Sequence, residues 1–284
     1  MTHHVLNLGA GVQSTWVYLA YTRGDITPQI DVAVFADTGE EPAAVYEHLA
    51  WLRSINGPQI LVRSIGSKLG DDLLRGQNST RHRFASIPAY TAEREGIQSG
   101  IVRRQCTHEY KVRVIERCIR RELLMLNPGQ RIPKGVHVKQ AFGISVDEKS
   151  RASRIYERWI MGEAPFEPAF PLLDLRMTRA DCISWLRQHI PHEVPRSACV
   201  FCPFKSNREW RHLRDTDPRG WARAVQIDDA LRIPGNVVNR GLDQKLYVHR
   251  DCIPLRCADL DGAGRRQLPL DPSWEDECVG MCGV

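Results

Sequence analysis

Residues 3–21 read HHVLNLGAGVQSTWVYLAY, and this stretch decides the fold class. The apolar run Val5–Leu8 predicts a buried strand, and the small-residue loop Gly9–Ser14 follows it at once. The residues after the loop predict a helix that runs to about Arg23. Strand, glycine loop and helix in this order bind phosphate in α/β proteins, because backbone N–H groups and the helix dipole point at the anion. The stretch therefore predicts a phosphate-binding α/β domain.

The rest of the chain continues this alternation of strands and helices. Strands are expected at residues 31–36, 60–63 and 140–145, and helices at 42–52, from 68, at 108–126 and from 177, with Thr178 as an N-cap. This order predicts βαβ units and a parallel sheet. We expect an α/β fold, a Rossmann-like three-layer α/β/α sandwich with a mainly parallel sheet, plus a small cysteine-containing C-terminal region.

Two stretches depart from the alternation. Residues 76–104 are polar, arginine-rich and without clear periodicity, which predicts a long functional loop. Beyond about Pro191 the chain becomes rich in cysteine, proline and aromatic residues. We expect a nucleotide-binding domain over residues 1–190 and a metal- or cluster-binding region over residues 191–284.

Composition and charge narrow the class of protein. The chain of 284 residues has no apolar run near the ~20 residues of a membrane span, and we see no signal peptide. We therefore expect a cytoplasmic protein without membrane contact. A net charge of +5 suits anionic partners, and equally a solvated arginine-rich surface.

The glycine loop allows more than one ligand. Gly9–Ser14 is close to the dinucleotide fingerprint G-x-G-x-x-G, and Asp37 follows the second predicted strand, where a ribose-binding carboxylate would lie. The loop lacks the G-K-[ST] ending of a Walker A loop, which excludes a nucleotide hydrolase of that type.

Five segments together resemble another group of proteins. Gly9–Thr15 resembles the S-G-G-x-D-S-T pyrophosphate loop of the adenine nucleotide α-hydrolases, with Gly9 in place of the serine and Gln13 in place of the aspartate. That group includes the N-type ATP pyrophosphatases and the phosphoadenosine phosphosulfate (PAPS) reductases. FADTGEEP at 35–42 resembles the F-x-D-T-G-x-E-x-P segment after the second strand of these proteins. RQCTHEYK at 104–111 resembles a segment of the uncharacterised phage and bacterial branch, and CVFCPF at 199–204 and ECVGMCGV at 277–284 complete the match.

The resemblance implies an adenine nucleotide site, with ATP or PAPS as the ligand and Mg²⁺ bridging the phosphates of ATP. The residues expected to bind the nucleotide are Gly9, Ala10, Gly11, Gln13, Ser14, Thr15, Asp37, Thr38 and Arg104. Gln13 in place of the aspartate favours a loop that binds sulfate or phosphate without cleaving ATP.

Nine cysteines in a chain with no export signal indicate metal ligation or thiol chemistry rather than a disulfide framework. The strongest signal is the CxxC pair Cys199 and Cys202. We expect Cys106 and Cys282 to complete a four-ligand site, with Cys278 as the substitute for Cys282. Relatives that move sulfur carry [4Fe-4S] clusters, which the resemblance favours, and a structural Zn²⁺ is the alternative.

The remaining cysteines and the tail have other expected roles. Cys278 resembles the mobile nucleophilic cysteine at the end of PAPS reductases. Cys118 and Cys182 lie in predicted helices and are expected to be buried, whereas Cys252 and Cys257 are ambiguous.

Several charged and aromatic residues are further candidates. Lys111 is a candidate phosphate contact, and residues 147–151 lie where open sheets bind ligands. The arginines at 81, 83, 103 and 104 could form an anion funnel or plain surface charge. Trp210 and Trp221 could stack on nucleic acid, although helix packing is the simpler use. The histidines at 108, 137, 192, 212 and 249 show no metal-ligand spacing and are expected to be structural.

Taken together, these patterns favour an ATP-dependent sulfurtransferase-like enzyme that adenylates an acceptor and releases pyrophosphate. The expected catalytic residues are Cys106, Lys111 and Cys278. The acceptor is expected to be a nucleobase, free or in tRNA or DNA, with a sulfur-donor or reductant protein as partner and a homodimer as the assembly. The alternatives are a PAPS-type sulfonucleotide reductase and a nucleotide- and metal-binding accessory protein of a DNA-modification or phage system.

Overall fold

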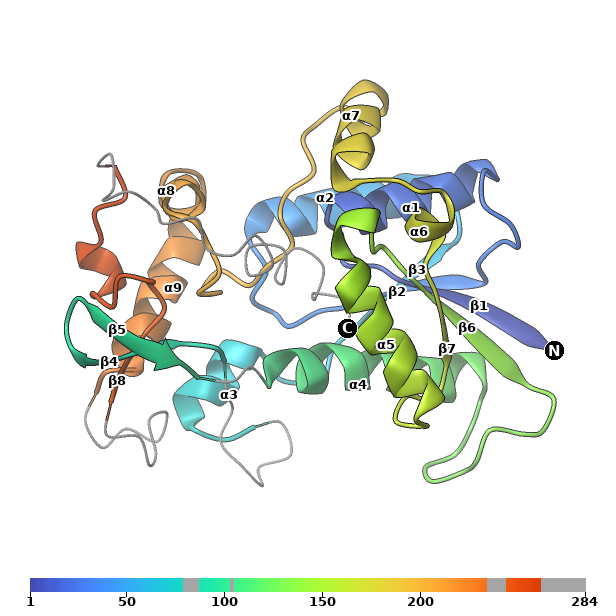
Figure 1. Cartoon of the computed structure of the whole chain (residues 1–284), viewed down its shortest axis with the longest axis horizontal. Coiled ribbons are helices and arrows are strands. Elements are labelled where there is room, and N and C mark those ends of the chain that lie inside the picture. Colours follow the sequence, from blue (N-terminus) through green and yellow to red (C-terminus); the bar gives the residue numbers. More distant parts are fainter. Residues whose placement is uncertain (79–86, 103–104, 234–243, 262–284) are drawn as a thin grey trace.

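The computed structural model describes residues 1–78, 87–102, 105–233 and 244–261. Its larger unit is built on a five-stranded parallel sheet in the order β3-β2-β1-β6-β7 (Figure 1). The strands are β1 (Thr2–Asn7), β2 (Val32–Ala36), β3 (Gln59–Arg63), β6 (His137–Phe142) and β7 (Glu167–Ala169). The predicted α/β fold with a mainly parallel sheet is confirmed.

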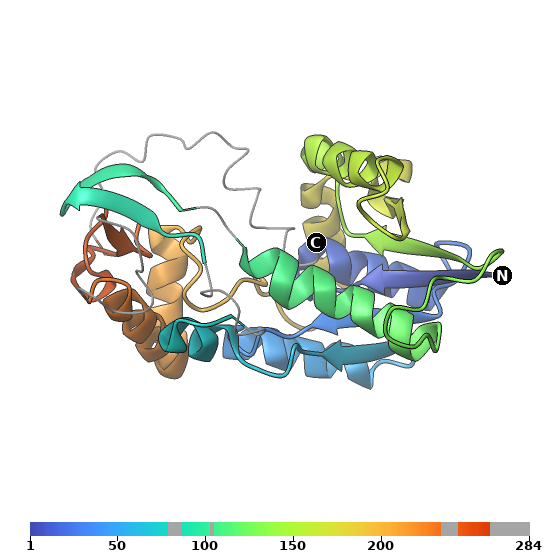
Figure 2. The same ribbon diagram turned by 90° about the horizontal axis from the view of Figure 1, so that it is seen from below.

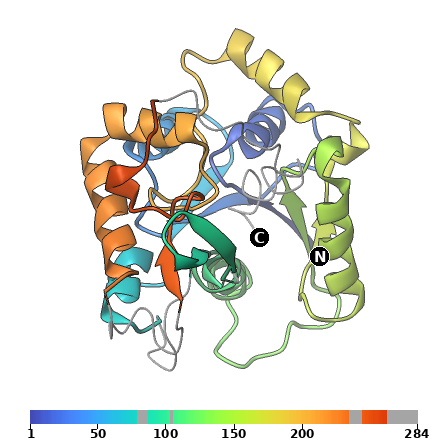
Figure 3. The same ribbon diagram turned by 60° about the vertical axis from the view of Figure 1, so that its left-hand side comes forward.

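Helices cover both faces of this sheet because successive strand residues point to opposite faces. Leu6 of β1 packs with one helical layer and Val5 with the other. The first layer holds α1 (Val12–Arg23), α2 (Ala43–Ser54), α6 (Pro171–Asp174) and α7 (Arg179–His189). The second layer holds α4 (Arg113–Cys118), seen end-on in Figure 3, and α5 (Lys149–Ile160) packs near the β6–β7 edge.

Most predicted elements of this unit are confirmed within a few residues. The predicted helix 108–126 is helical over 108–123, with π-helical turns at His108–Val112 and Ile119–Leu123 around α4. Thr178 caps α7, accepting a hydrogen bond from the Asp181 backbone N–H at 3.1 Å. Short 3₁₀ turns lie at Val146–Glu148 and Leu255–Cys257.

A second, smaller sheet lies at the other end of the molecule (Figures 1 and 2). It has the order β5-β4-β8, with all pairs antiparallel, from β4 (Tyr90–Arg94), β5 (Ile97–Ile101) and β8 (Lys245–Tyr247). The helices around it are α3 (Leu69–Arg75), α8 (Asn207–Thr216) and α9 (Pro218–Ala230). Their shared core joins Leu69, Leu73 and Ile87 to residues between Val200 and Leu260.

The expectation of a structureless loop over residues 76–104 is wrong for residues 90–101, which form the β4–β5 hairpin. β4 is held by pairing with β8, some 150 residues later, and local periodicity does not reveal such a pairing. The domain boundary after residue 190 stays a prediction, and the second core draws on residues from both sides of it. Within the described ranges, no helix combines the length and the apolar character needed to cross a membrane.

Candidate functional site

The glycine loop lies at the carboxyl end of β1, in the middle of the sheet. From β1 the chain passes through α1 to β2 on one side, while β6 pairs with β1 on the other. Such a reversal of strand order opens a crevice at the carboxyl edge, where open α/β sheets bind their ligands. The predicted nucleotide loop is therefore at the expected edge of the sheet.

Two backbone N–H groups of this loop converge on one oxygen atom. The N–H groups of Gly9 and Gly11 donate to the Ser14 Oγ at 3.1 and 3.3 Å. Ala10 between them has a left-handed φ of 56°, which turns the two amides to the same side. The Ser14 hydroxyl thus occupies a position that a phosphate oxygen would suit.

β6 approaches the loop closely because it ends in a glycine. A Cβ on Gly143 would lie 2.6 Å from the Ser14 nitrogen, so only glycine allows this contact. The loop is thereby fixed against both central strands of the sheet.

Two of the predicted nucleotide ligands point into the protein. The Gln13 amide donates to Glu148 Oε2 at 2.5 Å and to Ser145 Oγ at 3.3 Å, both after β6. Thr15 is fully buried, and its hydroxyl lies 2.9 Å from His48 Nε2 on α2. These side chains anchor α1 in the fold, while Gly9, Ala10, Gly11 and Ser14 form the loop itself.

His48, which contacts Thr15, also contacts a second histidine. Its Nδ1 lies 2.8 Å from His192 Nε2, and burial together with the neighbouring His192 lowers the pKa of His48 to about 4. The ring also stacks on Trp51. His48 is therefore a neutral, structural histidine, and it was not among the histidines considered from the sequence.

Asp37 and Thr38 lie at the carboxyl end of β2, beside the loop. Asp37 Oδ1 accepts from the Gly39 N–H at 2.7 Å and from the Tyr46 hydroxyl at 2.8 Å, and burial with this carboxylate raises the pKa of Tyr46. Thr38 is buried, and its hydroxyl lies 3.3 Å from the Cys199 sulfur. The predicted nucleotide segment therefore touches the CxxC segment directly.

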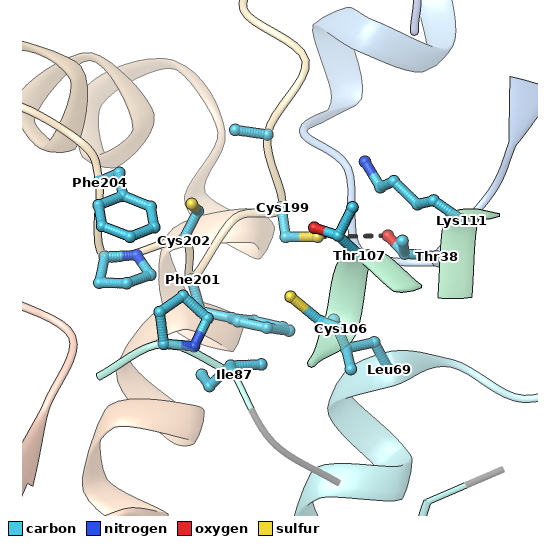
Figure 4. A pocket seen from close by; sticks show the side chains of 13 residues that line it. Thr38, Leu69, Ile87, Cys106, Thr107, Lys111, Cys199, Phe201, Cys202 and Phe204 are labelled. Carbon is cyan, nitrogen blue, oxygen red and sulfur yellow. Dashed lines mark hydrogen bonds between the residues drawn. The ribbon is translucent and has the colours of Figure 1, made fainter. Parts of the chain in front are cut away.

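Three of the predicted metal ligands line one pocket next to Thr38 (Figure 4). Cys106 comes from the start of the helix before α4, and Cys199 and Cys202 come from the segment before α8. In Figure 4 the side chains of Cys106 and Cys199 point toward the same space. The cavity itself measures about 40 Å³, with further space open to solvent, and it is lined by Thr38, Leu69, Ile87, Pro88, Cys106, Thr107, Lys111, Ala198, Cys199, Phe201, Cys202, Pro203 and Phe204.

The donor set of this pocket suits a soft metal, because thiolates prefer zinc and iron–sulfur clusters and the apolar walls limit access of water. As the side chains stand, no three groups of His, Cys, Asp or Glu within residues 1–78, 87–102, 105–233 and 244–261 are gathered closely enough to hold one ion. The predicted fourth ligand, Cys282, its substitute Cys278, and the arginines at 81, 83, 103 and 104 lie outside the described residues.

Lys111 lines the same pocket and belongs to a buried ion pair. Its ammonium lies 3.0 Å from Glu41 Oε1, and the side chains of Lys111 and Glu41 are 6% and 0% exposed. The other oxygen of Glu41 is buried without a hydrogen-bond partner in the described part of the chain. Glu41 was not among the predicted site residues, although its position in FADTGEEP was a signal that could have identified it.

Residues 147–151 are the last candidates after β6; Glu148 and Arg151 are buried, whereas Asp147, Lys149 and Ser150 are exposed. Asp147 accepts from the Arg179 backbone N–H at 2.6 Å. Glu148 pairs with Arg151 at 3.0 Å, and both side chains are buried. Glu148 reaches the loop helix through Gln13.

The other cysteines and the tryptophans serve the core. Cys118 and Cys182 are buried as predicted, and burial raises their pKa values to about 11 and about 12. Cys252 is also buried, whereas Cys257 is exposed. Trp210 is fully buried and packs edge-on against Trp221, so it does not stack on nucleic acid.

Comparison with protein families, with curated proteins and with solved structures finds no match to this chain.

Proposed function

We propose that this protein is an adenine-nucleotide-dependent enzyme of the sulfurtransferase type, which adenylates an acceptor, releases pyrophosphate and then delivers sulfur to it. The observation that carries the proposal is the 3.3 Å contact between Thr38 and Cys199. It joins the segment expected to bind the nucleotide to a pocket lined by three cysteines. An enzyme that couples nucleotide activation to sulfur chemistry needs these two parts side by side.

The chemistry follows from the parts. An acceptor carbonyl oxygen attacks the α-phosphorus of ATP, and the bond to the β-phosphate breaks so that pyrophosphate leaves. A hydrosulfide supplied by a donor protein then attacks the activated carbon and displaces AMP, and loss of the sulfur-bound proton gives the thiocarbonyl product. The Gly9 and Gly11 N–H groups donate to the Ser14 hydroxyl in the structure, and all three groups would turn to the leaving pyrophosphate when the nucleotide binds. Bound Mg²⁺ would neutralise part of the phosphate charge.

A bound [4Fe-4S] cluster would supply a site for the sulfur atom at the pocket. Cys106, Cys199 and Cys202 would hold it, together with Cys282. Lys111 would add positive charge at the pocket wall facing the nucleotide segment. We propose a nucleobase, free or in tRNA or DNA, as the acceptor.

A second candidate is reduction of a PAPS-type sulfonucleotide. It is favoured by Gln13, which replaces the expected aspartate and turns away from the loop toward Glu148. A loop without a carboxylate suits an anion that is bound but not cleaved. In this reaction a cysteine thiolate attacks the sulfur, an S–S bond to the sulfonate forms, and adenosine bisphosphate leaves. A dithiol reductant protein then displaces sulfite, and its second thiol frees the cysteine as the reductant becomes a disulfide.

The first experiment tests nucleotide binding with two variants of one residue. Gly11 has an extended φ of −103°, and a Cβ there would meet only Ser197 at 3.8 Å, so a side chain is tolerated. Asp and Asn are both good N-caps of α1, but only Asp places a negative charge beside the phosphates. We expect Gly11→Asp to weaken ATP binding at least tenfold relative to Gly11→Asn in calorimetric titration, a difference of about 1.4 kcal/mol.

Turnover then separates the candidates. Pyrophosphate released from ATP in the presence of a nucleobase acceptor supports the sulfurtransferase. Adenosine bisphosphate released from PAPS with a thiol reductant supports the reductase. Wild-type protein that binds neither ATP nor PAPS would exclude both enzymes.

A further inference from the structure

The segment before the CxxC pair crosses the glycine loop. An ideal Cβ on Gly11 would lie 3.8 Å from the Ser197 Cβ and 3.9 Å from the Ser197 nitrogen. Two residues further on, Cys199 contacts Thr38. Ser197 thus faces the loop from a part of the chain about 185 residues away, at the same edge of the sheet.

Ser197 carries a hydroxyl that the fold does not use. The residue is 4% exposed, and its Oγ has no hydrogen-bond partner among the described residues. Burying a hydroxyl without a hydrogen bond costs free energy, so the position favours a ligand that supplies one.

A buried positive charge lies close to the same segment. Lys205 is 6% exposed, and its ammonium donates to the Ala198 carbonyl at 3.5 Å, next to Ser197 in the chain. Within the described part of the chain, the ammonium makes this one weak hydrogen bond and lies 5.8 Å from the centre of the Trp210 ring, and no carboxylate there lies within ion-pair distance of it. An ammonium has three N–H donors, so a buried one favours an anion nearby.

From these contacts we infer that Ser197 donates a hydrogen bond to a tetrahedral oxyanion held by the glycine loop, with Lys205 as the buried charge behind it. The inference rests on the proposed function in that the oxyanion is a phosphate or sulfate of the nucleotide. It adds a ligand from the C-terminal part of the chain, so the bound nucleotide is enclosed between the loop and residues 197–205.

The test uses an isosteric pair in the full-length chain. Ser197→Thr keeps the hydroxyl, whereas Ser197→Val gives a side chain of the same shape as threonine but without the hydroxyl. Titrations with ATP, inorganic pyrophosphate and adenosine separate the oxyanion from the nucleoside. We expect Ser197→Val to bind ATP and pyrophosphate about tenfold or more weakly than Ser197→Thr, with equal binding of adenosine, because a hydrogen bond to a charged group is lost.

The melting temperature gives a second readout, because a purely structural role of Ser197 predicts a change of the opposite sign. In the absence of ligand, Ser197→Ala should have a melting temperature equal to or above that of the wild type, since removing a buried hydroxyl without a partner relieves its desolvation cost. A structural serine would instead lower the melting temperature when replaced.

The outcomes distinguish the inference from the proposed function. Equal ATP binding by the two isosteric variants, or an equal loss for adenosine, would overturn the inference and leave the proposed function standing. Pyrophosphate binding that depends on Ser197, with ATP bound no better than pyrophosphate, would support the oxyanion site. It would overturn the proposal that the ligand is an adenine nucleotide. A wild type that binds none of the three probes would overturn both.

Discussion

The Thr38 hydroxyl and the Cys199 sulfur lie 3.3 Å apart, although 161 positions separate them in the chain. Thr38 follows the second strand of the parallel sheet, and Cys199 lies in the segment that leads to the smaller unit. The contact makes the edge of the sheet and the cysteine pocket one continuous site.

This contact should control the reactivity of Cys199. Thr38→Val preserves the shape of the side chain but removes the hydroxyl that can donate to a thiolate. In metal-free protein we expect iodoacetamide to alkylate Cys199 about fivefold more slowly, which corresponds to one hydrogen bond of about 1 kcal/mol. Peptide mass spectrometry measures the rate, and the exposed Cys257 serves as the internal control. Alkylation of Cys199 at the wild-type rate would show that the hydroxyl does not act on the thiolate.

His48 should make stability depend on pH below neutrality. Its pKa is about 4 in the folded protein and about 6.5 in the unfolded chain, so the unfolded chain takes up a proton that the native state does not. The free energy of unfolding is therefore unaffected above about pH 6.5, and it falls as the pH drops from there toward about 4. At pH 5 the loss from this residue is about 2 kcal/mol.

The check is urea denaturation of wild type and His48→Gln at pH 7.5 and pH 5. The variant should lose less stability between the two pH values by about that amount. His212→Gln, at an exposed histidine, is the matched control and should behave as the wild type. Parallel pH profiles for wild type and His48→Gln would mean that His48 takes up its proton equally easily in both states.

Removing one partner of the buried ion pair between Lys111 and Glu41 should lower the free energy of unfolding. Lys111→Met leaves a carboxylate with 0% exposure and no counter-charge at 3.0 Å, and we expect a loss of about 3–5 kcal/mol in the free energy of unfolding. The double variant Lys111→Met with Glu41→Gln removes that charge and should recover part of the loss. Chemical denaturation of the single and double variants measures both effects, and a single variant as stable as the wild type would rule out a charged Glu41.

The cysteine pocket should bind iron in protein purified without oxygen. We expect about four irons and four sulfides per chain with absorbance near about 400 nm, and loss of both in Cys106→Ser, Cys199→Ser and Cys202→Ser. Cys257→Ser, at an exposed cysteine outside the pocket, should keep the metal. One zinc per chain in a colourless protein would show that the cysteines form a structural zinc site rather than bind a cluster. Full iron content in Cys199→Ser would show that the cluster is bound somewhere other than in this pocket.

Much of the larger unit could be predicted because its signals are local. The run VAVFA of β2 is buried at all five positions, which is typical of a parallel strand covered on both faces. The Thr178 cap is likewise set by residues three apart. The hairpin at residues 90–101 was missed because its partner β8 is distant in the chain.

The candidate site also has a part that the sequence could predict and a part that it could not. Short motifs indicated the glycine loop and the CxxC pair, and the position after the second predicted strand indicated Asp37. Thr38 was indicated by the family resemblance of FADTGEEP. These signals did not indicate that Gln13 turns inward to Glu148, that Thr15 serves His48, or that Glu41 pairs with Lys111. Each of these depends on which buried partner needs a hydrogen bond or a counter-charge, and that is set by packing.

The sequence by itself determined the α/β class and the residue types that could bind an anion or a metal, because strand, loop and helix propensities act over a few neighbouring residues. Only the tertiary structure decided that Cys106, Cys199 and Thr38 share one pocket and that Ser197 lies over Gly11. Those contacts join segments separated by roughly 70 to 190 positions, and they form because the carboxyl ends of parallel strands meet at one edge, where the segment before α8 packs against them.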